Sequence, residues 1–449
     1  MNTRNSSFQQ YYENLLNTSP SKKPLDWRNV KGLSREKIDC LNDMVPVDVA
    51  EEKSLLDSLL VCKLNGGLGT SMGCAGPKAA IEVKNNKTFL DLIIEQIICA
   101  KDKTGADVQL ILMNSFYTEK DTDDILANYA SSLSIKTFSQ SKRRRTRSDT
   151  HIPLSEEAFG NEAYYPPGHG DFYNCFFNQG LLSSYLEQGK KFVFISNADN
   201  LGATIDTRII KYMEQHEIPF LCEVAERTRA DSKGGTFIYN EHGSPKLLEI
   251  AQVPNGHKKD FESIKDFGIF NTNNVWINLK ALKKAIDENS LNLDLIFNAK
   301  EVGGIPVVQT ETAMASAITS FSEARCLLVD RKRFLPVKKT DDLFMIRSDL
   351  FIEKDGQLYR NPKRDSESLP LVRLGEFCKT VAGMEKRIPS LPSIIDLELL
   401  TIVGDVHFGQ NITLRNQVIL TCTEGSLFLP DSSVINNQAL AGRIQIAEL

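Results

Sequence analysis

The stretch LLVCKLNGGLGTSMGCAGPK, residues 59–78, decides both the fold class and the chemistry expected of this chain. It opens on the apolar run Leu59–Leu64, which is typical of a buried strand, and continues into a loop with five glycines in eleven residues. Glycine has no Cβ, so such a loop can turn backbone N–H groups toward a polyphosphate, and Lys78 adds a positive charge at its end. We therefore expect a phosphate cradle rather than a flexible connector, which seldom carries Pro77-Lys78 before a long apolar helix.

The loop belongs to neither of the common phosphate-binding patterns. A Walker loop needs Gly-Lys-Ser/Thr at the entrance to a helix, and the dinucleotide pattern needs Gly-x-Gly-x-x-Gly. Strand patterns recur at 108–113 and 191–196, and helical spacing recurs at 88–100 and 121–129. Short apolar runs separated by helices predict a parallel, doubly wound α/β sheet, which binds ligands beyond the carboxyl ends of its strands.

The C-terminal part has a different repeat. Apolar residues recur there every six positions, at Val406, Ile412 and Val418, and at Phe408, Leu414 and Leu420. Two such series indicate a left-handed parallel β-helix, in which each side of a triangular coil offers inward positions, and about three coils fit before the last residue. A set of antiparallel hairpins is the alternative.

Composition excludes several classes of protein. The chain has 449 residues, more than one ordinary core holds, so two or three domains are expected. Its net charge of −5 argues against a dedicated nucleic-acid binder. No apolar run approaches the ~20 residues of a membrane span, and the first residues lack the apolar core of a secretory signal. The nine cysteines show no paired metal spacing, so we expect a cytoplasmic protein with reduced thiols and neither membrane nor nucleic-acid partners.

Further motifs follow the glycine loop in a fixed order. They are PGHGD (167–171), NADNLG (197–202), KGGT (233–236), EIAQV (249–253), FNTNN (270–274) and RFLPVK (333–338). With the loop, they make nearly the whole chain resemble the eukaryotic-type UTP–glucose-1-phosphate uridylyltransferases, or UDP-glucose pyrophosphorylases. The resemblance implies a Rossmann-like, GT-A-like nucleotidyltransferase core with a mixed sheet, followed by the left-handed parallel β-helix.

The same resemblance implies a division of the chain into four segments. We expect an N-terminal helical segment at 1–58, a catalytic nucleotidyltransferase domain at 59–340, a linker at 341–382 and a β-helix domain at 383–449. Members of the family occur as monomers and as assemblies built through the C-terminal β-helix, so a homo-oligomer through that domain is one of two expected states.

The reaction implied by the resemblance is a reversible in-line displacement. A phosphate oxygen of glucose 1-phosphate attacks the α-phosphorus of UTP, so that UDP-glucose forms and pyrophosphate leaves. The protein needs no covalent nucleophile but must position two anions and neutralise charge, for which Lys78, Lys338 and Asp199 are the expected catalytic residues. Mg²⁺ is the expected cofactor and Asp199, just past an apolar strand, its expected ligand. The alternative role for Asp199 is to cap the next helix.

The resemblance also assigns binding residues. For UTP it implies Leu64, Asn65, Gly66, Gly67, Lys78, Gln140, Gly168, Asp199 and Lys338. For the sugar phosphate it implies Gly66, Gly67, His169, Asn197, Gly235, Glu249 and Asn273. Asn271 or Asn274 is an alternative to Asn273. Histidine can donate to a phosphate oxygen in either protonation state, and polar groups that hold specific hydroxyls give sugar selectivity.

Two stretches depart from the family pattern. Ala79 stands where a serine usually follows Gly-Pro-Lys, and we expect a modest effect because the lysine and glycines remain. The basic run Lys142–Arg147 replaces the usual Tyr-Pro-Arg after Gln140. We expect a solvated surface loop there, with a nuclear-type signal or an anion-binding patch as alternatives.

Three rival functions can be weighed on the sequence. A UDP-N-acetylhexosamine or broader UDP-sugar pyrophosphorylase usually has arginine where Ser71 stands, so Ser71-Met72 favours glucose. A hexapeptide-repeat acyltransferase needs more coils than residues 400–449 can build. A nucleotide-binding scaffold without activity would not need the two lysines, the histidine and the aspartate together.

Overall fold

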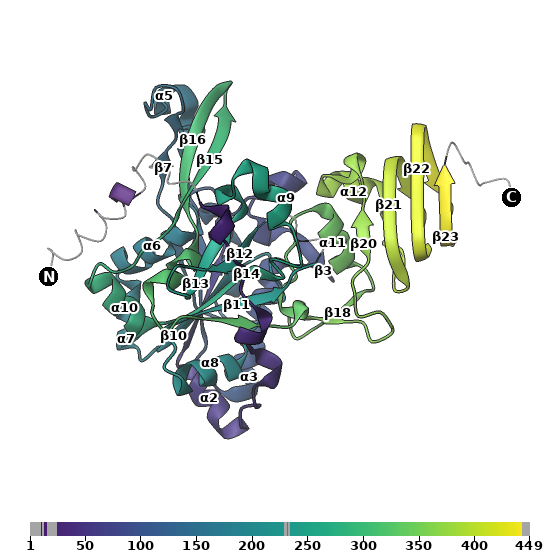
Figure 1. Cartoon of the computed structure of the whole chain (residues 1–449). Coiled ribbons are helices and arrows are strands. Elements are labelled where there is room, and N and C mark those ends of the chain that lie inside the picture. The colour runs from purple at the N-terminus through teal and green to yellow at the C-terminus, as the bar shows by residue number, and fades with distance from the viewer. Residues whose placement is uncertain (1–9, 11–12, 16–24, 229–230, 232–233, 442–449) are drawn as a thin grey trace. The chain divides into compact units, whose positions relative to one another are not determined.

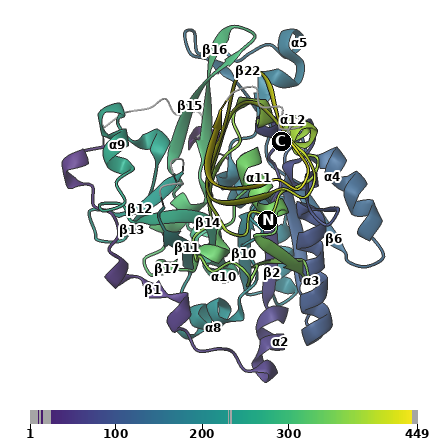
Figure 2. The ribbon, with the colours of Figure 1, turned by 90° about the vertical axis from the view of Figure 1, so that its right-hand side faces the viewer.

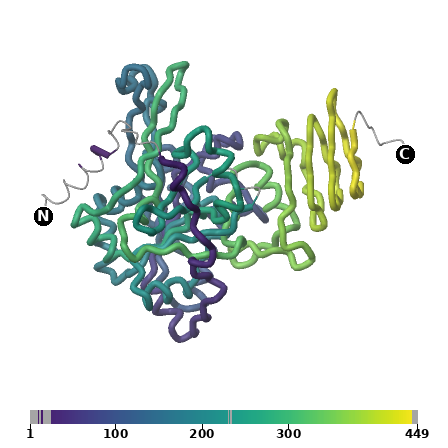
Figure 3. The backbone as a smooth tube through the Cα atoms, viewed as in Figure 1, coloured from purple at the N-terminus to yellow at the C-terminus, as the bar shows by residue number. Residues whose placement is uncertain are grey.

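The computed structural model describes residues 10, 13–15, 25–228, 231 and 234–441, and the colours of Figure 3 follow the backbone through them. The chain forms two compact units. Unit 1 holds the stretches Met1–Gly66, Ala100–Asn197 and Ile205–Phe334. Unit 2 holds Gly67–Cys99, Ala198–Thr204 and Leu335–Leu449. The glycine loop and the NADNLG motif therefore contribute residues to both units.

An eight-stranded mixed sheet forms the centre of unit 1 (Figure 1). In spatial order its strands are β1 (Asp39–Cys40), β17 (Arg325–Leu328), β11 (Phe220–Glu226), β14 (Ile269–Asn278), β10 (Phe192–Asn197), β2 (Leu59–Leu64), β5 (Gln109–Asn114) and β6 (Ile135–Ser139). All neighbours are parallel except the two pairs that β14 makes, with β10 and β11. The mixed α/β core is thus confirmed, whereas the wholly parallel arrangement predicted from periodicity is wrong at β14. An apolar run indicates a strand but not its direction, which the connecting segments set.

Unit 1 also contains several α-helices. They are α2 (Val49–Asp57), α4 (Glu119–Leu126), α5 (Glu156–Phe159), α6 (Phe172–Asn178), α7 (Leu181–Glu187), α8 (Thr207–Gln215), α9 (Lys258–Phe261) and α10 (Leu279–Asp287). Apolar side chains of α6, α7 and α10 pack in one buried cluster with alternate residues of the strands, such as Leu60 and Cys62 on β2. Successive strand residues point to opposite faces, so this alternation identifies the face that these helices cover.

The predicted N-terminal helices are only partly present. Residues 1–9, 11–12 and 16–24 of that segment lie outside the described part of the chain. Between residues 25 and 48 the chain forms three short 3₁₀ turns and strand β1 rather than polar helices. Pairing of β1 with β17 is a tertiary contact, which local helical spacing does not reveal. Helix α2 then leads into β2 as expected.

Smaller sheets complete unit 1. Strands β12 (Gly235–Tyr239) and β13 (Pro245–Glu249) form an antiparallel pair, and residues 250–252 form a 3₁₀ turn directly after β13. The remaining strands are β15 (Leu295–Val302), β16 (Ile305–Thr312), β7 (Arg143–Arg144), β8 (Thr146–Arg147) and β9 (Tyr164–Tyr165). Strand β8 pairs with β16, and β7 pairs with β9.

The basic run lies in these small strands rather than in a free loop. Arg143 forms an ion pair with Glu13, and Arg147 lies 2.8 Å from Asp149. The Nζ of Lys142 lies 4.0 Å from the ring centroid of Tyr164. Three of the basic side chains of the run therefore already have partners within the chain, which weighs against a dedicated anion-binding patch.

Unit 2 contains the second half of the glycine loop and the C-terminal strands. Its elements are β3 (Glu82–Lys84), β4 (Lys87–Thr88), most of α3 (Phe89–Thr104), α11 (Thr340–Arg347), β18 (Phe351–Lys354), β19 (Gln357–Arg360), β20 (Leu371–Arg373), α12 (Val381–Arg387), β21 (Leu397–Phe408), β22 (Thr413–Leu429) and β23 (Val434–Ala441). Strands β18 and β19 form a hairpin inside the predicted linker, with Asp355 in a left-handed conformation at the turn.

The last four strands are parallel and stack in the order β20-β21-β22-β23 (Figure 1). Figure 2 views the same strands end-on. Parallel pairing excludes the antiparallel alternative. All six residues of the six-residue repeat are buried, none more than 4% exposed. Among the described residues, no helix is long and apolar enough to cross a membrane.

Candidate active site

The predicted site residues fall into two sets. In unit 1 are Leu64, Asn65, Gly66, Gln140, Gly168, His169, Asn197, Gly235, Glu249 and Asn273. In unit 2 are Gly67, Lys78, Asp199 and Lys338. Half of the first set lie at or just after the carboxyl ends of β2, β6 and β10, because parallel strands bring those ends to one edge of the sheet.

The end of β2 is held rigidly. Leu64 pairs across the sheet with Asn197 on one side and Met113 on the other. Asn65 is buried, and its amide Nδ2 donates to Asn114 Oδ1 at 2.8 Å and to Thr122 Oγ1 at 2.9 Å. The Asn65 side-chain N–H groups therefore brace the strand end. Any contact of Asn65 with UTP would have to use its other polar atoms, which are its Oδ1 and its backbone groups.

Gly66 and Gln140 meet at this edge. A Cβ on Gly66 would collide with the Gln140 amide nitrogen, so only glycine lets that amide lie over the loop. The backbone N–H of Gln140 donates to the Asn114 carbonyl at 2.9 Å, which continues the pairing of β5 with β6. Its Oε1 is buried and has no hydrogen-bond partner among the described residues. An amide with an unpaired acceptor suits the N–H and carbonyl edge of a pyrimidine base.

His169 lies in a 3₁₀ turn that is packed closely against residue 312. Cβ atoms on Gly168 and Gly170 would lie 2.7 Å and 2.5 Å from atoms of Thr312, and Gly168 has a left-handed φ of +86°. The Met314 N–H donates to His169 Nδ1 at 2.9 Å. Burial lowers the pKa of the ring to about 4, so the imidazole is neutral near pH 7. Because Nδ1 accepts, the proton sits on Nε2, which is then a hydrogen-bond donor.

Asn197 and Asn273 face each other. Asn273 lies in a bulge of β14 with a φ of +58°, and its Nδ2 donates to Asn197 Oδ1 at 2.9 Å. Its Oδ1 is buried without a partner among the described residues. Asn274 instead donates to Glu223, and Asn271 accepts from the Asn273 backbone. Of the three candidate asparagines, Asn273 is therefore the one that joins Asn197.

Gly235 and Glu249 pair directly across the β12–β13 hairpin. A Cβ on Gly235 would lie 2.8 Å from Glu249 Oε1, so the carboxylate lies over the glycine. The Glu249 backbone N–H donates to Gln252 Oε1 at 2.9 Å, which anchors the strand end. Lys233, the first residue of the KGGT motif, is outside the described residues.

The unit 2 half of the glycine loop closes on itself. The Lys78 N–H donates to the Gly67 carbonyl at 3.0 Å, and Leu68 forms an isolated antiparallel bridge with Pro77. Met72 is fully buried inside it. Ala79 is 2% exposed, so the position that departs from the family pattern faces the interior. The loop is thus closed by its own hydrogen bonds, unlike a flexible connector, and its role as a phosphate cradle stays a prediction.

Lys78 is paired with Asp199. Its Nζ lies 2.5 Å from Asp199 Oδ2, and both side chains are less than a fifth exposed. The other oxygen, Oδ1, is buried with no partner among the described residues. Asp199 does not cap a helix, because Asp206 caps α8 by accepting from the Arg208 N–H. The helix-cap alternative is therefore wrong for Asp199.

The segment just before Lys338 is hydrogen-bonded to the segment that carries Asp199. The Val337 N–H donates to the Asp199 carbonyl at 3.2 Å, and Asn200 bridges to Pro336. Lys338 itself is exposed, and its N–H donates to Asp342 Oδ2 at 2.7 Å. The segments that carry Asp199 and Lys338 are consequently neighbours in unit 2.

The charged groups are suited to a metal ion that binds together with substrate phosphates. They are less suited to a site in which the protein alone supplies the ligands. Among the described residues, no group of three or more acidic, histidine or cysteine side chains is placed to hold an ion. Mg²⁺ is usually bound by one or two carboxylates together with substrate phosphates and water. A single aspartate with one unpaired oxygen matches that mode.

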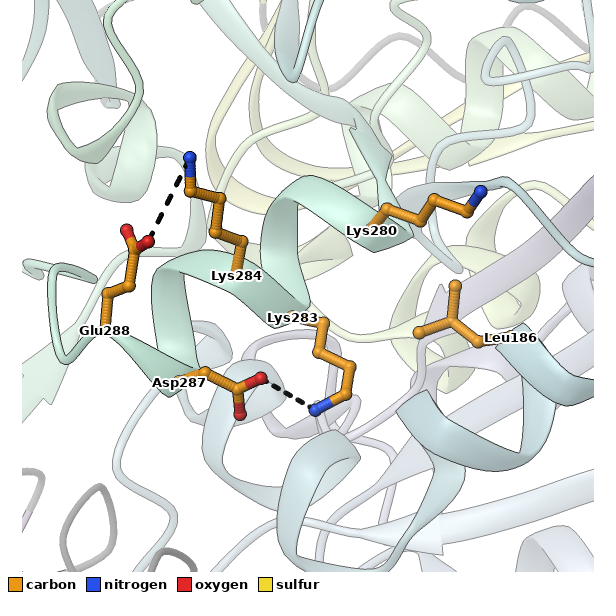
Figure 4. Close-up of a pocket in the computed structure, with 6 residues that line it drawn as sticks. All are labelled: Leu186, Lys280, Lys283, Lys284, Asp287 and Glu288. Carbon is orange, nitrogen blue, oxygen red and sulfur yellow. Dashed lines mark hydrogen bonds and ion pairs between the residues drawn. The ribbon is translucent and has the colours of Figure 1, made fainter.

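A hollow lies elsewhere on unit 1, between α7 and α10 (Figure 4). Its volume is about 360 Å³, and it is lined by Leu186, Lys280, Lys283, Lys284, Asp287 and Glu288. Lys283 is paired with Asp287 at 2.8 Å along the same helix. No predicted site residue lines it, so it has no part in the candidate site.

Motif patterns in the sequence do not reveal the buried groups behind the site. Glu223 is fully buried and accepts from Arg333, Trp276 and Asn274, which braces the bulge of β14. Asp171 is fully buried behind the PGHGD turn. A charged residue inside an apolar strand, as in FLCEVAE at 220–226, is the signal that would have identified Glu223.

Comparison with known proteins identifies the family of the chain. The model of the UTP–glucose-1-phosphate uridylyltransferase family matches residues 5–415. Relatives with that name include one from Encephalitozoon cuniculi, 44% identical over 98% of this chain and 88% of its own length. Another, from Solanum tuberosum, is 45% identical over 93% of this chain and 89% of its own.

Solved structures give the same result. A UDP-glucose phosphorylase from Trypanosoma brucei has a TM-score of 0.86 at 33% identity, covering 97% of this chain and 95% of that one. A UDP-glucose pyrophosphorylase from Leishmania major has a TM-score of 0.83 at 32% identity, covering 97% and 94%. The resemblance inferred from the motifs is confirmed: this chain belongs to the UTP–glucose-1-phosphate uridylyltransferase family.

Proposed function

We propose that the protein makes UDP-glucose and pyrophosphate from UTP and glucose 1-phosphate, in a reversible reaction. The observation that carries this proposal is the pairing of Lys78, at the end of the closed glycine cradle, with Asp199. A cation beside phosphates and a carboxylate with an unpaired oxygen are the two groups that a triphosphate and its metal ion require. Relatives over nearly the whole chain carry the name of this activity.

The proposed mechanism is direct in-line transfer. Lys78 and Lys338 offset the negative charge that builds up as the sugar phosphate attacks the α-phosphorus and pyrophosphate leaves. His169, neutral and protonated on Nε2, donates to the sugar phosphate without adding a charge that would depend on pH near neutrality. Asp199 would hold Mg²⁺, which would supply further neutralisation of the phosphates.

Base and sugar are bound by the groups of unit 1. Gln140, supported by Gly66 and the backbone of Gly168, reads the uracil edge. Glu249, Asn197 and Asn273 bind glucose hydroxyls, because a polar site built for specific hydroxyls rejects sugars that leave its groups unpaired. The unpaired Oε1 of Gln140 and Oδ1 of Asn273 support these roles.

A substrate panel tests the proposal. Purified full-length protein is incubated with Mg²⁺, UTP and, in separate reactions, the 1-phosphates of glucose, galactose, N-acetylglucosamine and mannose, and pyrophosphate release is followed. Glucose 1-phosphate should be preferred by at least about tenfold in kcat/KM. Equal rates with galactose or N-acetylglucosamine phosphates would overturn the glucose assignment, and no release with any sugar would overturn the enzyme assignment.

We also infer that the C-terminal strands are coils of a left-handed β-helix within a domain at 383–449, after a linker at 341–382 and a catalytic domain at 59–340. Support comes from the register, since Leu400 pairs with Val418 and Ile402 with Leu420, an offset of three six-residue sides. The outer strand β23 offers an edge at which two copies of the chain could pair as a homo-oligomer. Light scattering on the purified chain measures the molar mass that decides this. A cytoplasmic location is proposed on the nine free cysteines.

A further inference from the structure

Asp171 is a buried carboxylate without a part in the proposed chemistry. It has no exposed surface, and it lies in the 3₁₀ turn His169–Asp171 before α6. Burial raises its pKa, and hydrogen bonds from Ser141, Cys175 and Asn174 counter that effect. Burying an ionisable group costs several kcal/mol unless its partners compensate, so such a residue usually holds something specific in place.

Its strongest contacts go to the residue that follows Gln140. Oδ2 accepts from the Ser141 N–H at 2.6 Å, and Oδ1 accepts from the Ser141 hydroxyl at 3.2 Å. Oδ2 also accepts from Cys175 Sγ at 3.1 Å, and Oδ1 from Asn174 Nδ2 at 3.1 Å. The carboxylate thus binds both the main chain and the side chain of Ser141.

These contacts begin where the sheet ends. The Gln140 N–H is the last one in this stretch to follow the β5–β6 ladder, by donating to the Asn114 carbonyl. The next N–H, of Ser141, goes to Asp171 instead. Gln140 therefore has a fixed peptide on each side, one held by the sheet and the other by the buried carboxylate.

The orientation of Gln140 matters for base selectivity. A glutamine amide that is free to rotate by half a turn presents the complementary pattern, which matches cytosine as well as uracil. Fixing the backbone and packing the amide over Gly66 limits that freedom. Asp171 also helps to fix the turn that contains His169, because the Asp171 N–H donates to the Gly168 carbonyl at 3.2 Å.

We propose that Asp171 is a positioning residue for base recognition: by clamping Ser141 it holds the Gln140 amide in the orientation that accepts uracil and rejects cytosine. The inference rests on the proposed function, since it requires a uridine nucleotide as substrate. Asp171 does not touch the substrate and acts through Gln140.

The test compares kcat/KM for UTP and for CTP, with glucose 1-phosphate and Mg²⁺, in full-length variants. Asp171→Ala should lower the UTP:CTP ratio by about tenfold, the effect of losing a charge-assisted hydrogen bond. Asp171→Asn keeps a weaker oxygen acceptor for the Ser141 N–H and should lower the ratio by about threefold. Cys175→Ala is the matched control. It removes a partner of the same carboxylate and a 3.7 Å contact with the Ser141 hydroxyl, but it keeps both hydrogen bonds from Ser141 to Asp171, so it should keep the wild-type ratio.

A purely structural role would lower the folded fraction, and activity with both nucleotides equally, without moving the ratio. An unchanged ratio in Asp171→Ala, or in Asp171→Asn if the alanine variant does not fold, would overturn the inference. A ratio that falls equally in Cys175→Ala would also overturn it. Failure of the wild-type protein to release pyrophosphate from UTP would instead reject the proposed function.

Discussion

Lys78 Nζ and Asp199 Oδ2 lie 2.5 Å apart, although 121 positions separate the two residues in the chain. Lys78 is held by its own N–H to the Gly67 carbonyl, and Asp199 by the Val337 N–H to its carbonyl. The pair therefore joins the glycine cradle, the NADNLG motif and the segment before Lys338 inside unit 2. In the proposed mechanism, this pair supplies the cation that contacts the phosphates and the carboxylate that binds the metal ion.

Removing the Lys78 charge should abolish most of the turnover. Lys78→Ala should lower kcat by at least about two orders of magnitude, because the charge on the phosphates is no longer offset in the transition state. Steady-state pyrophosphate release measures kcat, and circular dichroism checks the fold. The control is Lys87→Ala, which removes a lysine of unit 2 that is paired with Glu95 and Glu353 and should leave kcat within about twofold. Near-normal turnover in Lys78→Ala would contradict its assignment.

Asp199 should set the magnesium requirement. In Asp199→Asn, the Mg²⁺ concentration for half-maximal activity should rise at least about tenfold and kcat should fall about a hundredfold, since an amide is a weaker ligand for a hard cation. Titration of activity with MgCl₂ measures both. Asp206→Asn is the control: it changes a helix cap and an ion pair with Arg208, so it should alter stability by about 1 kcal/mol but not the Mg²⁺ titration. An identical titration in Asp199→Asn and wild type would argue against the metal role.

Gly235 in the β12–β13 hairpin should affect the binding of glucose 1-phosphate more than the binding of UTP. Gly235→Ala places a methyl group 2.8 Å from Glu249 Oε1, so the carboxylate must move. KM for glucose 1-phosphate should rise at least about tenfold while KM for UTP changes less than about twofold. Gly256→Ala provides the comparison, because no atom lies within 4 Å of its added Cβ. Equal increases in both KM values would assign Gly235 to the fold and not to the sugar.

Stability should fall on acidification partly through His169. Its folded pKa is about 4 and its unfolded value 6.5, so between these pH values the unfolded chain binds a proton that the folded chain does not. The contribution is fully present above pH 6.5 and is lost as the pH falls toward 4, by up to about 3 kcal/mol. Urea unfolding at pH 7, 6 and 5 measures it against His169→Gln, which cannot titrate. A pH dependence that is the same in both proteins would contradict the buried neutral ring.

The buried ion pair between Arg333 and Glu223 should contribute strongly to the free energy of unfolding. Arg333→Met leaves Glu223 buried without its cation, which should cost about 3–5 kcal/mol in the free energy of unfolding. Arg35→Met, which breaks an exposed pair with Glu226, should cost less than about 1 kcal/mol. Urea midpoints measure both, and a small loss in Arg333→Met would show that Glu223 is satisfied by its other donors.

The sequence predicted the elements that have a strong local signal. Strand β2 has the predicted bounds Leu59–Leu64, and helix α3 extends the predicted one by a few residues, because long apolar periodic runs are the clearest patterns. The six-residue repeat likewise predicted the inward side chains of the C-terminal strands. By contrast, β1, the direction of β14 and the β18–β19 hairpin depend on partners distant in the chain.

The same limit applies to the site. Motif residues such as Lys78, His169 and Asp199 were found because they stand beside glycines or strand ends in a familiar order. Their supports were not, because the bonds from Asp171 to Ser141 and from Arg333 to Glu223 join positions 30 and 110 residues apart. Local spacing says nothing about such pairs, and the tautomer of His169 depends on the Met314 N–H, 145 positions away.

The central claim is direct uridylyl transfer from UTP to the sugar phosphate, and its stereochemistry is the most direct measurement. The protein is incubated with Mg²⁺, glucose 1-phosphate and one diastereomer of UTP that carries sulfur on the α-phosphorus, and ³¹P NMR determines the configuration of the sugar nucleotide formed. A single in-line displacement without a covalent enzyme intermediate predicts UDP-glucose with inverted configuration at the α-phosphorus. The diastereomer that the enzyme turns over is used, and retained configuration in its product would contradict the claim.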